Sequence, residues 1–132
     1  MLEPKVVIFH EDDIDKIIQE CLIYPYCKII VAVPVSKIKD ITLIFSEHID
    51  EKTLVNRFRI STTCAIANFT NGAELRIIGN NVQSRGQRAS KIYCSPDTSV
   101  EVYFEILWPQ ILNYEHILRN IKTEEVEDET MA

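Results

Sequence analysis

Residues 67–97 read ANFTNGAELRIIGNNVQSRGQRASKIYCSPD, and this stretch decides the fold. It contains all three glycines of the chain, and its apolar runs are separated by turn signals. Asn71-Gly72 lies between two of these runs, which is the pattern of a β-hairpin because both residues tolerate positive φ. The second arm ends at Gly79, and after a polar loop the run Lys91–Cys94 predicts another buried strand.

The segment before this stretch has the pattern of a βαβ unit. Lys5–Phe9 and Lys28–Val33 are short apolar runs rich in β-branched residues, which predicts two buried strands. Between them, apolar residues recur at helical spacing from Ile14 to Leu22, and Pro25 ends that helix. Because such a connection crosses over to a parallel neighbour, we expect an α/β fold with a mostly parallel central sheet flanked by helices.

Residues 36–49 fit two structures. Their apolar residues match the spacing of a helix capped by Ser36: Ile38, Ile41, Phe45 and Ile49. The run 41–45 taken alone would also fit a strand. We favour the helix because the segment is long and polar residues flank its apolar face. A second short helix is predicted near residues 53–58, with Arg57 and Arg59 solvated.

The longest periodic segment follows Asp97. Its apolar residues step by four and three, which places them on one helical stripe: Val100, Phe104, Leu107, Ile111, Tyr114 and Leu118. Thr98 and Glu101 have the spacing of a capping box, and Pro109 is expected to kink or divide the helix. We predict a single α/β domain over residues 1–121 and an acidic, disordered tail over residues 122–132.

Composition excludes several classes of function. The net charge of −6 makes the average surface repel phosphate and anionic membranes, so nucleic acid is not the favoured partner. No cysteine has a C-x-x-C partner or a histidine at ligand spacing, so we interpret all four as reduced core residues: Cys21, Cys27, Cys64 and Cys94. No signal peptide or membrane-length apolar run is evident, and we expect a soluble, cytoplasmic protein with no cofactor or metal.

One loop is both basic and rich in amides, and it is the candidate binding loop. It could bind phosphate, nucleic acid or an acidic protein surface, and a plain solvated loop is the alternative interpretation. Its candidate residues are Asn80, Asn81, Gln83, Arg85, Arg88 and Lys91.

The order of these signals resembles the ATPase domain of phage large terminase subunits, a branch of the P-loop ATPases. In that family a hairpin with an Asn-Gly turn leads to a strand that reaches a glycine, a loop with an Arg-Gly step, an apolar strand and a helix. The corresponding features here are Asn71-Gly72, Gly79, Arg85-Gly86, Ile92–Cys94, and Phe104 with Leu107. The likeness covers residues 5–118 and rests on pattern and spacing.

The chain departs from this family at both nucleotide motifs. The family's phosphate loop is rich in glycine and ends in Gly-Lys-Ser or Gly-Lys-Thr, whereas residues 9–16 read FHEDDIDK. A carboxylate about 4 Å from a phosphate charge costs about 4 kcal/mol, so this segment should expel a triphosphate. The family's Asp-Glu pair, which holds Mg²⁺ and positions water, is replaced by Ser95-Pro96.

The resemblance and its gaps together predict a fold without ATP hydrolysis. The first hypothesis is a non-catalytic, terminase-like protein that binds a protein partner in a phage or prophage setting. The alternative is a nucleic-acid-associated or nucleotide-dependent protein of a DNA packaging or processing assembly, which would use the loop from Arg85 to Lys91. No catalytic residue is assigned under the first hypothesis.

Overall fold

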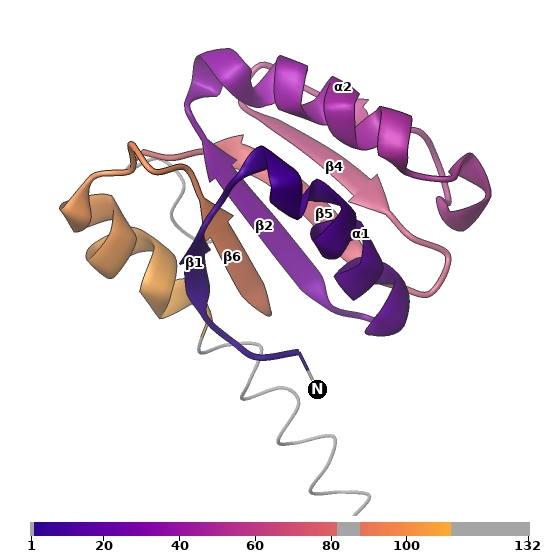
Figure 1. The fold of residues 1–132 in the computed structure, drawn as a ribbon, viewed down its shortest axis with the longest axis horizontal. Helices are drawn as coiled ribbons and strands as arrows, with labels where there is room; N and C mark the ends of the chain where they lie inside the picture. Colours follow the sequence, from indigo (N-terminus) through magenta and orange to yellow (C-terminus); the bar gives the residue numbers. More distant parts are fainter. Residues whose placement is uncertain (1, 82–87, 112–132) are drawn as a thin grey trace, which may run out of the picture.

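The computed structural model of the chain describes residues 2–81 and 88–111. Within these residues a six-stranded sheet forms, with strand order β1-β6-β2-β5-β4-β3 (Figure 1). Neighbouring strands from β1 to β5 are parallel, and β4 pairs antiparallel with both β5 and β3. The predicted α/β fold with a mostly parallel sheet is confirmed.

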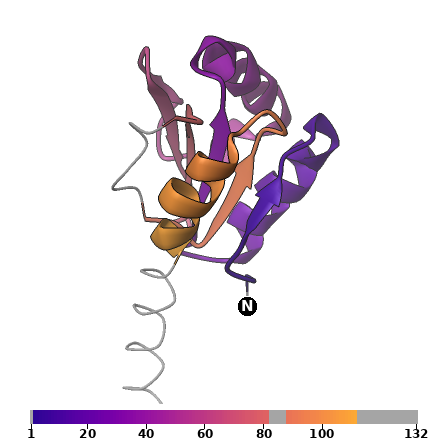
Figure 2. The same cartoon turned by 90° about the vertical axis from the view of Figure 1, so that its left-hand side faces the viewer.

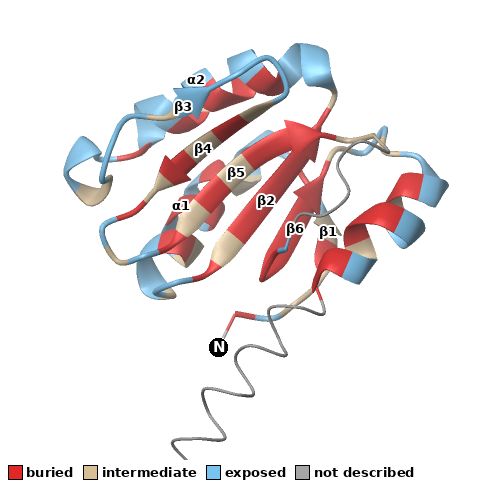
Figure 3. Cartoon of the chain, turned by 180° about the vertical axis from the view of Figure 1, so that it is seen from behind, coloured by how far each residue is buried: buried red, intermediate tan, exposed pale blue. Residues whose placement is uncertain are grey.

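The parallel half of the sheet contains the strands that the apolar runs predicted. These strands are β1 (Val6–Ile8), β6 (Lys91–Cys94), β2 (Lys28–Val33) and β5 (Glu74–Gly79). Every residue of β6 and all but the first of β2 are buried (Figure 3), with one apolar cluster on each face of the sheet. Burial on both faces explains why these strands read as continuous apolar runs rather than alternating ones.

Two helices cover one face of the sheet. Helix α1 (Ile14–Ile23) follows a 3₁₀ turn, η1 (Glu11–Asp13), and helix α2 (Ile38–His48) follows η2 (Val35–Lys37). The segment that fitted two structures is therefore helical, although Ser36 lies within η2 and makes no cap. Its inward residues, together with those of α1, join the larger apolar core under both helices.

The hairpin is formed by β4 (Cys64–Asn68) and β5, and its turn also fastens α1. Of the two turn residues, Asn71 and Gly72, only Gly72 has a positive φ, of 89°, although both tolerate one. Asn71 instead uses its side chain, which donates to the carbonyl oxygens of Cys21 at 2.8 Å and Leu22 at 3.2 Å. These are terminal carbonyls of α1 that lack partners within the helix.

A third helix covers the other face of the sheet, as the edge-on view shows (Figure 2). It begins at Val100 and contains a π-helical segment, η5 (Val102–Leu107). Because a π turn holds more residues than an α turn, the predicted stripe is partly wrong: Val100 and Phe104 are exposed. The buried residues are Val102, Ile106, Leu107, Gln110 and Ile111.

The start of this helix also differs from the prediction. Ser99 Oγ accepts from the backbone N–H of Val102, at 3.2 Å, so Ser99 replaces Thr98 as the capping residue. The helix continues through Pro109, and the wide turn before it accommodates a ring that would clash with the preceding carbonyl of an α-helix. Tyr114, Leu118 and the acidic tail lie outside the described residues.

The antiparallel edge replaces the short helix predicted near residues 53–58. A 3₁₀ turn, η3 (Glu51–Thr53), is followed by an isolated bridge from Leu54 to Phe69, by bends at residues 55–57 and by the two-residue strand β3 (Arg59–Ile60). The backbone N–H of Val55 bonds to Asn68 of β4, and Arg59 pairs with Ile66. Val55 and Arg59 are four positions apart, whereas their partners on β4, Asn68 and Ile66, are two positions apart. The edge segment therefore has two extra residues, which form a bulge.

Candidate functional site

The carboxyl ends of the parallel strands form the edge at which α/β sheets usually bind ligands. The turn after β1 contains His10 and the carboxylates Glu11, Asp12 and Asp13, with no glycine. The N–H of His10 donates to Asp13 Oδ2 at 3.0 Å, and the N–H of Asp13 donates to the His10 carbonyl at 2.8 Å. Both amides are therefore already bonded within the turn, and the carboxylates of Glu11 and Asp12 are exposed beside them.

The neighbouring loops at this edge are bonded to one another. The side-chain amide of Asn80 donates to Asp97 Oδ1 and to Thr98 Oγ1, both at 3.1 Å. The backbone N–H groups of Asn80 and Ser95 bond to the carbonyls of Val33 and Ala32, respectively. The Asn80 side chain therefore links the loop after β5 to the loop after β6.

The structure does not bring the predicted loop residues together. Asn80 and Asn81 follow the carboxyl end of β5, and Arg88 is exposed near the amino end of β6. Lys91 belongs to β6 itself and is buried, as the run Lys91–Cys94 predicted, so it does not lie in the polar loop with the other candidate residues. Gln83 and Arg85 lie outside the described residues.

Lys91 is part of a buried polar cluster between α1 and β6. Its ammonium donates to Glu20 Oε2 at 2.8 Å and lies 4.7 Å from the centre of the Tyr93 ring. The Tyr93 hydroxyl donates to the other oxygen of Glu20. Burial, followed by this hydrogen bond and the charge of Glu20, raises the pKa of Tyr93 far above its usual range. These contacts tie the helix to the strand.

The cysteines are poor candidates for nucleophilic chemistry. Cys21, Cys27 and Cys94 are buried, and the partly exposed Cys64 lies beside Ser61. A hydrogen bond with Cys27 and burial raise the pKa of Cys21, and burial raises that of Cys94. Raised pKa values keep these two thiols protonated and unreactive.

The described residues contain neither a metal-binding cluster nor a membrane-spanning helix. No cluster of three or more histidine, cysteine or acidic side chains there could hold a metal ion. His48 contacts a carboxylate, that of Asp15, at 3.0 Å on the surface. Among the helices of the same residues, none is both apolar enough and long enough to cross a membrane.

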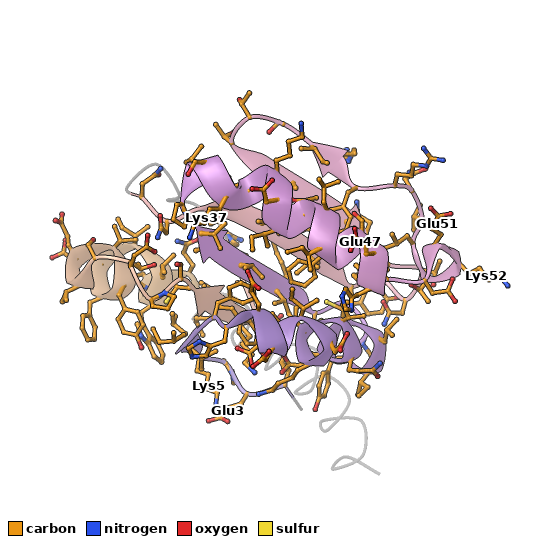
Figure 4. All side chains as sticks on the ribbon, turned by 45° about the horizontal axis from the view of Figure 1, so that its top comes forward. Glu3, Lys5, Lys37, Glu47, Glu51 and Lys52 are labelled. Atoms are coloured by element: carbon orange, nitrogen blue, oxygen red, sulfur yellow. The ribbon has the colours of Figure 1, made fainter. Side chains whose placement is uncertain are left out.

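A groove of about 580 Å³ lies at the opposite side of the sheet from β1, where the bulged segment leaves β4. Its walls come from the end of α2, from η3 and from β3, with these lining residues: Ser46, Ile49, Glu51, Leu54, Val55, Asn56, Arg57, Phe58 and Ile60. Val55 and Ile60 are 60% and 49% exposed, and they share the groove with polar and charged side chains such as Asn56 and Arg57. Figure 4 shows Lys52 projecting from η3 beside Glu51.

Sequence reasoning missed this groove because it assigned the segment to a helix. The signal was present in the composition. From Lys52 through Ala73 the chain has three cations and no carboxylate, although the whole protein is acidic.

No protein-family model matches the chain, and comparison with curated proteins and with solved structures finds no match either.

Proposed function

We propose that this protein is a non-catalytic relative of the terminase ATPase fold that acts by binding another protein. We further propose a phage or prophage origin and a cytoplasmic location. The observation that carries the proposal is the acidic turn after β1. A triphosphate there would meet exposed carboxylates at Glu11 and Asp12, and the turn's own hydrogen bonds occupy the amides of His10 and Asp13.

The comparison on which the proposal rests assigns roles to two positions in the sheet. Strands β1 and β2 are parallel to β6, and the hairpin strand β5 lies parallel to β2 on the far side from β6. In this arrangement the end of β1 is where an ATPase of that family would hold phosphate, and the end of β6 is where it would hold Mg²⁺. Ser95 and Pro96 occupy the second position and supply no carboxylate ligand.

Binding of a protein partner is supported by the groove at the other side of the sheet. Exposed apolar side chains that cluster around a hollow mark interaction surfaces more often than scattered ones do. Val55 and Ile60 are such a pair, since both line the groove and both are largely exposed.

The experiment is isothermal titration of the full chain with ATP and Mg²⁺, together with a phosphate-release assay. We expect no saturable heat from ATP and no turnover above the protein-free rate. Titration with Mg²⁺ alone is the control, because exposed carboxylates give weak heats with cations. Micromolar ATP binding or measurable hydrolysis would overturn the proposal.

A further inference from the structure

The outer edge of β3 leaves backbone hydrogen-bonding groups facing solvent. Ser61 N–H bonds to the Cys64 carbonyl, so the next pair along the ladder, Ile60 with Ala65, is of the non-hydrogen-bonded kind. The N–H and carbonyl of Ile60 consequently point away from β4. Within the described residues, no strand lies beyond β3 to receive them.

The two faces of this edge have different chemistry. Ile60 is paired with Ala65, which belongs to the core under α2, and its side chain lines the groove on that face. Arg59 is paired with Ile66 on the opposite face, because successive side chains of a strand alternate. A chain laid along β3 would therefore meet the groove, with the apolar side chains of Val55 and Ile60, on one face and a guanidinium on the other.

The cations at this edge are available to a partner. Arg57 and Arg59 are exposed, and neither takes part in the ion pairs found among the described residues. Arg57 lies at the groove, where Glu51 is the acidic side chain of the lining. The complement of this edge is an extended chain in which apolar side chains alternate with carboxylates.

We propose that an extended segment of a partner protein, with alternating apolar and acidic residues, adds to β3 as a seventh strand. The proposal rests on the protein-binding function proposed above and specifies its surface. Backbone bonds to Ile60 would provide affinity, and two sets of side chains would provide specificity. The apolar set enters the groove beside Val55 and Ile60, and the acidic set pairs with Arg59.

The probes are two short synthetic peptides, one alternating Glu with Val and Ile and the other alternating Lys with the same residues. Each is titrated into the isotopically labelled full chain, and backbone amide shifts are followed by NMR. We expect the Glu peptide to shift the amides around Val55 and Ile60 and to bind about tenfold more tightly than the Lys peptide. Arg59→Glu should reverse that preference.

Two substitutions at one position separate backbone from side-chain recognition. Ile60→Ala retains the outward N–H and removes most of the apolar side chain, whereas Ile60→Pro removes the N–H and retains a compact apolar ring. Strand addition requires Ile60→Pro to bind more weakly than Ile60→Ala. Equal binding by the two variants would overturn the proposal, as would shifts confined to another face or equal affinity for the Glu and Lys peptides.

Failure of this inference is distinguishable from failure of the proposed function. If neither peptide binds and Mg²⁺ with ATP also gives no binding, the β3 edge is not the docking surface but the protein-binding function stands. If ATP binds, the proposed function fails whatever the peptides do.

Discussion

The parallel half of the sheet and its antiparallel edge differ in the burial and pairing of their cationic side chains. Lys91 in β6 has a side chain that is 4% exposed, bonded to Glu20 and packed over Tyr93. Arg59 in β3 is exposed and forms no ion pair within the described residues. The Lys91 side chain joins α1 to β6 through Glu20. The Arg59 side chain is available to a partner.

Backbone and amide groups show the same difference. At the carboxyl ends of the parallel strands, the Asn80 side chain and the turn at His10 bond within the protein. At the outer edge of β3, the groups of Ile60 remain open. At the usual ligand-binding edge of an α/β sheet these groups are therefore already bonded, whereas those of Ile60 lie at the other end of the strand order.

The largest effect should come from breaking the buried cluster. Glu20→Ala leaves the ammonium of Lys91 buried without its carboxylate, and we expect a loss of about 3–5 kcal/mol in the free energy of unfolding. Urea denaturation measures it. Asp15→Ala is the matched control, because its pair with His48 is exposed and should contribute less than about 1 kcal/mol.

A triple variant tests whether compensation of charge is the whole role of the cluster. Glu20→Leu, Lys91→Met and Tyr93→Phe together replace every polar member with an apolar residue of similar size. We expect stability within about 1 kcal/mol of the natural chain, because no uncompensated group remains buried. A triple variant as unstable as Glu20→Ala would contradict this account.

Sequence reasoning succeeded where one local signal decides a structure. The apolar run Lys28–Val33 is buried on both faces and became β2 unchanged, and the helical spacing from Ile38 to Phe45 prevailed over the alternative strand. The Asn-Gly turn was located correctly, yet its second role could not be predicted. That role depends on α1 ending beside Asn71, nearly fifty residues away in sequence.

The errors concern residues whose surroundings are set by distant parts of the chain. The sequence places Lys91 both at the end of a basic loop and in a buried run, and only the packing of α1 on β6 places Glu20 beside it. The stripe through Phe104 assumed an α-helical period, and the π segment altered it. The segment near residues 53–58 was predicted to be a short helix. Instead, Val55 bonds to Asn68, and Arg59, just after the segment, pairs with Ile66 of β4.

Raising the pH above about 10 should destabilise the folded protein through Tyr93. The pKa of Tyr93 is raised in the folded protein, so its contribution to stability is fully present below its unfolded pKa of about 10 and declines as the pH rises above that value. We expect Tyr93 to steepen the loss by about 1.4 kcal/mol per pH unit. Urea denaturation at several pH values above 10 measures this slope.

Tyr93→Phe is the control for this titration. It also removes the hydrogen bond to Glu20, so the two proteins are compared by slope and not by absolute stability. The variant should lose stability less steeply above pH 10, while the remaining tyrosines and the thiols contribute equally to both proteins. Identical slopes would mean that Tyr93 ionises in the folded state as it does in the unfolded state.

The smallest effects should come from proline substitutions in β3, which compare its two backbone N–H groups directly. The N–H of Arg59 faces β4 in a hydrogen-bonded pair, whereas the N–H of Ile60 faces solvent. Arg59→Pro should therefore cost about 1 kcal/mol or more through the lost ladder bond, and Ile60→Pro less than about 0.5 kcal/mol. Both values come from urea denaturation, and hydrogen exchange at Ile66 reports the ladder directly. If Ile60→Pro proves the more damaging of the two, its N–H is already bonded within the fold, and the β3 edge is closed to a partner strand.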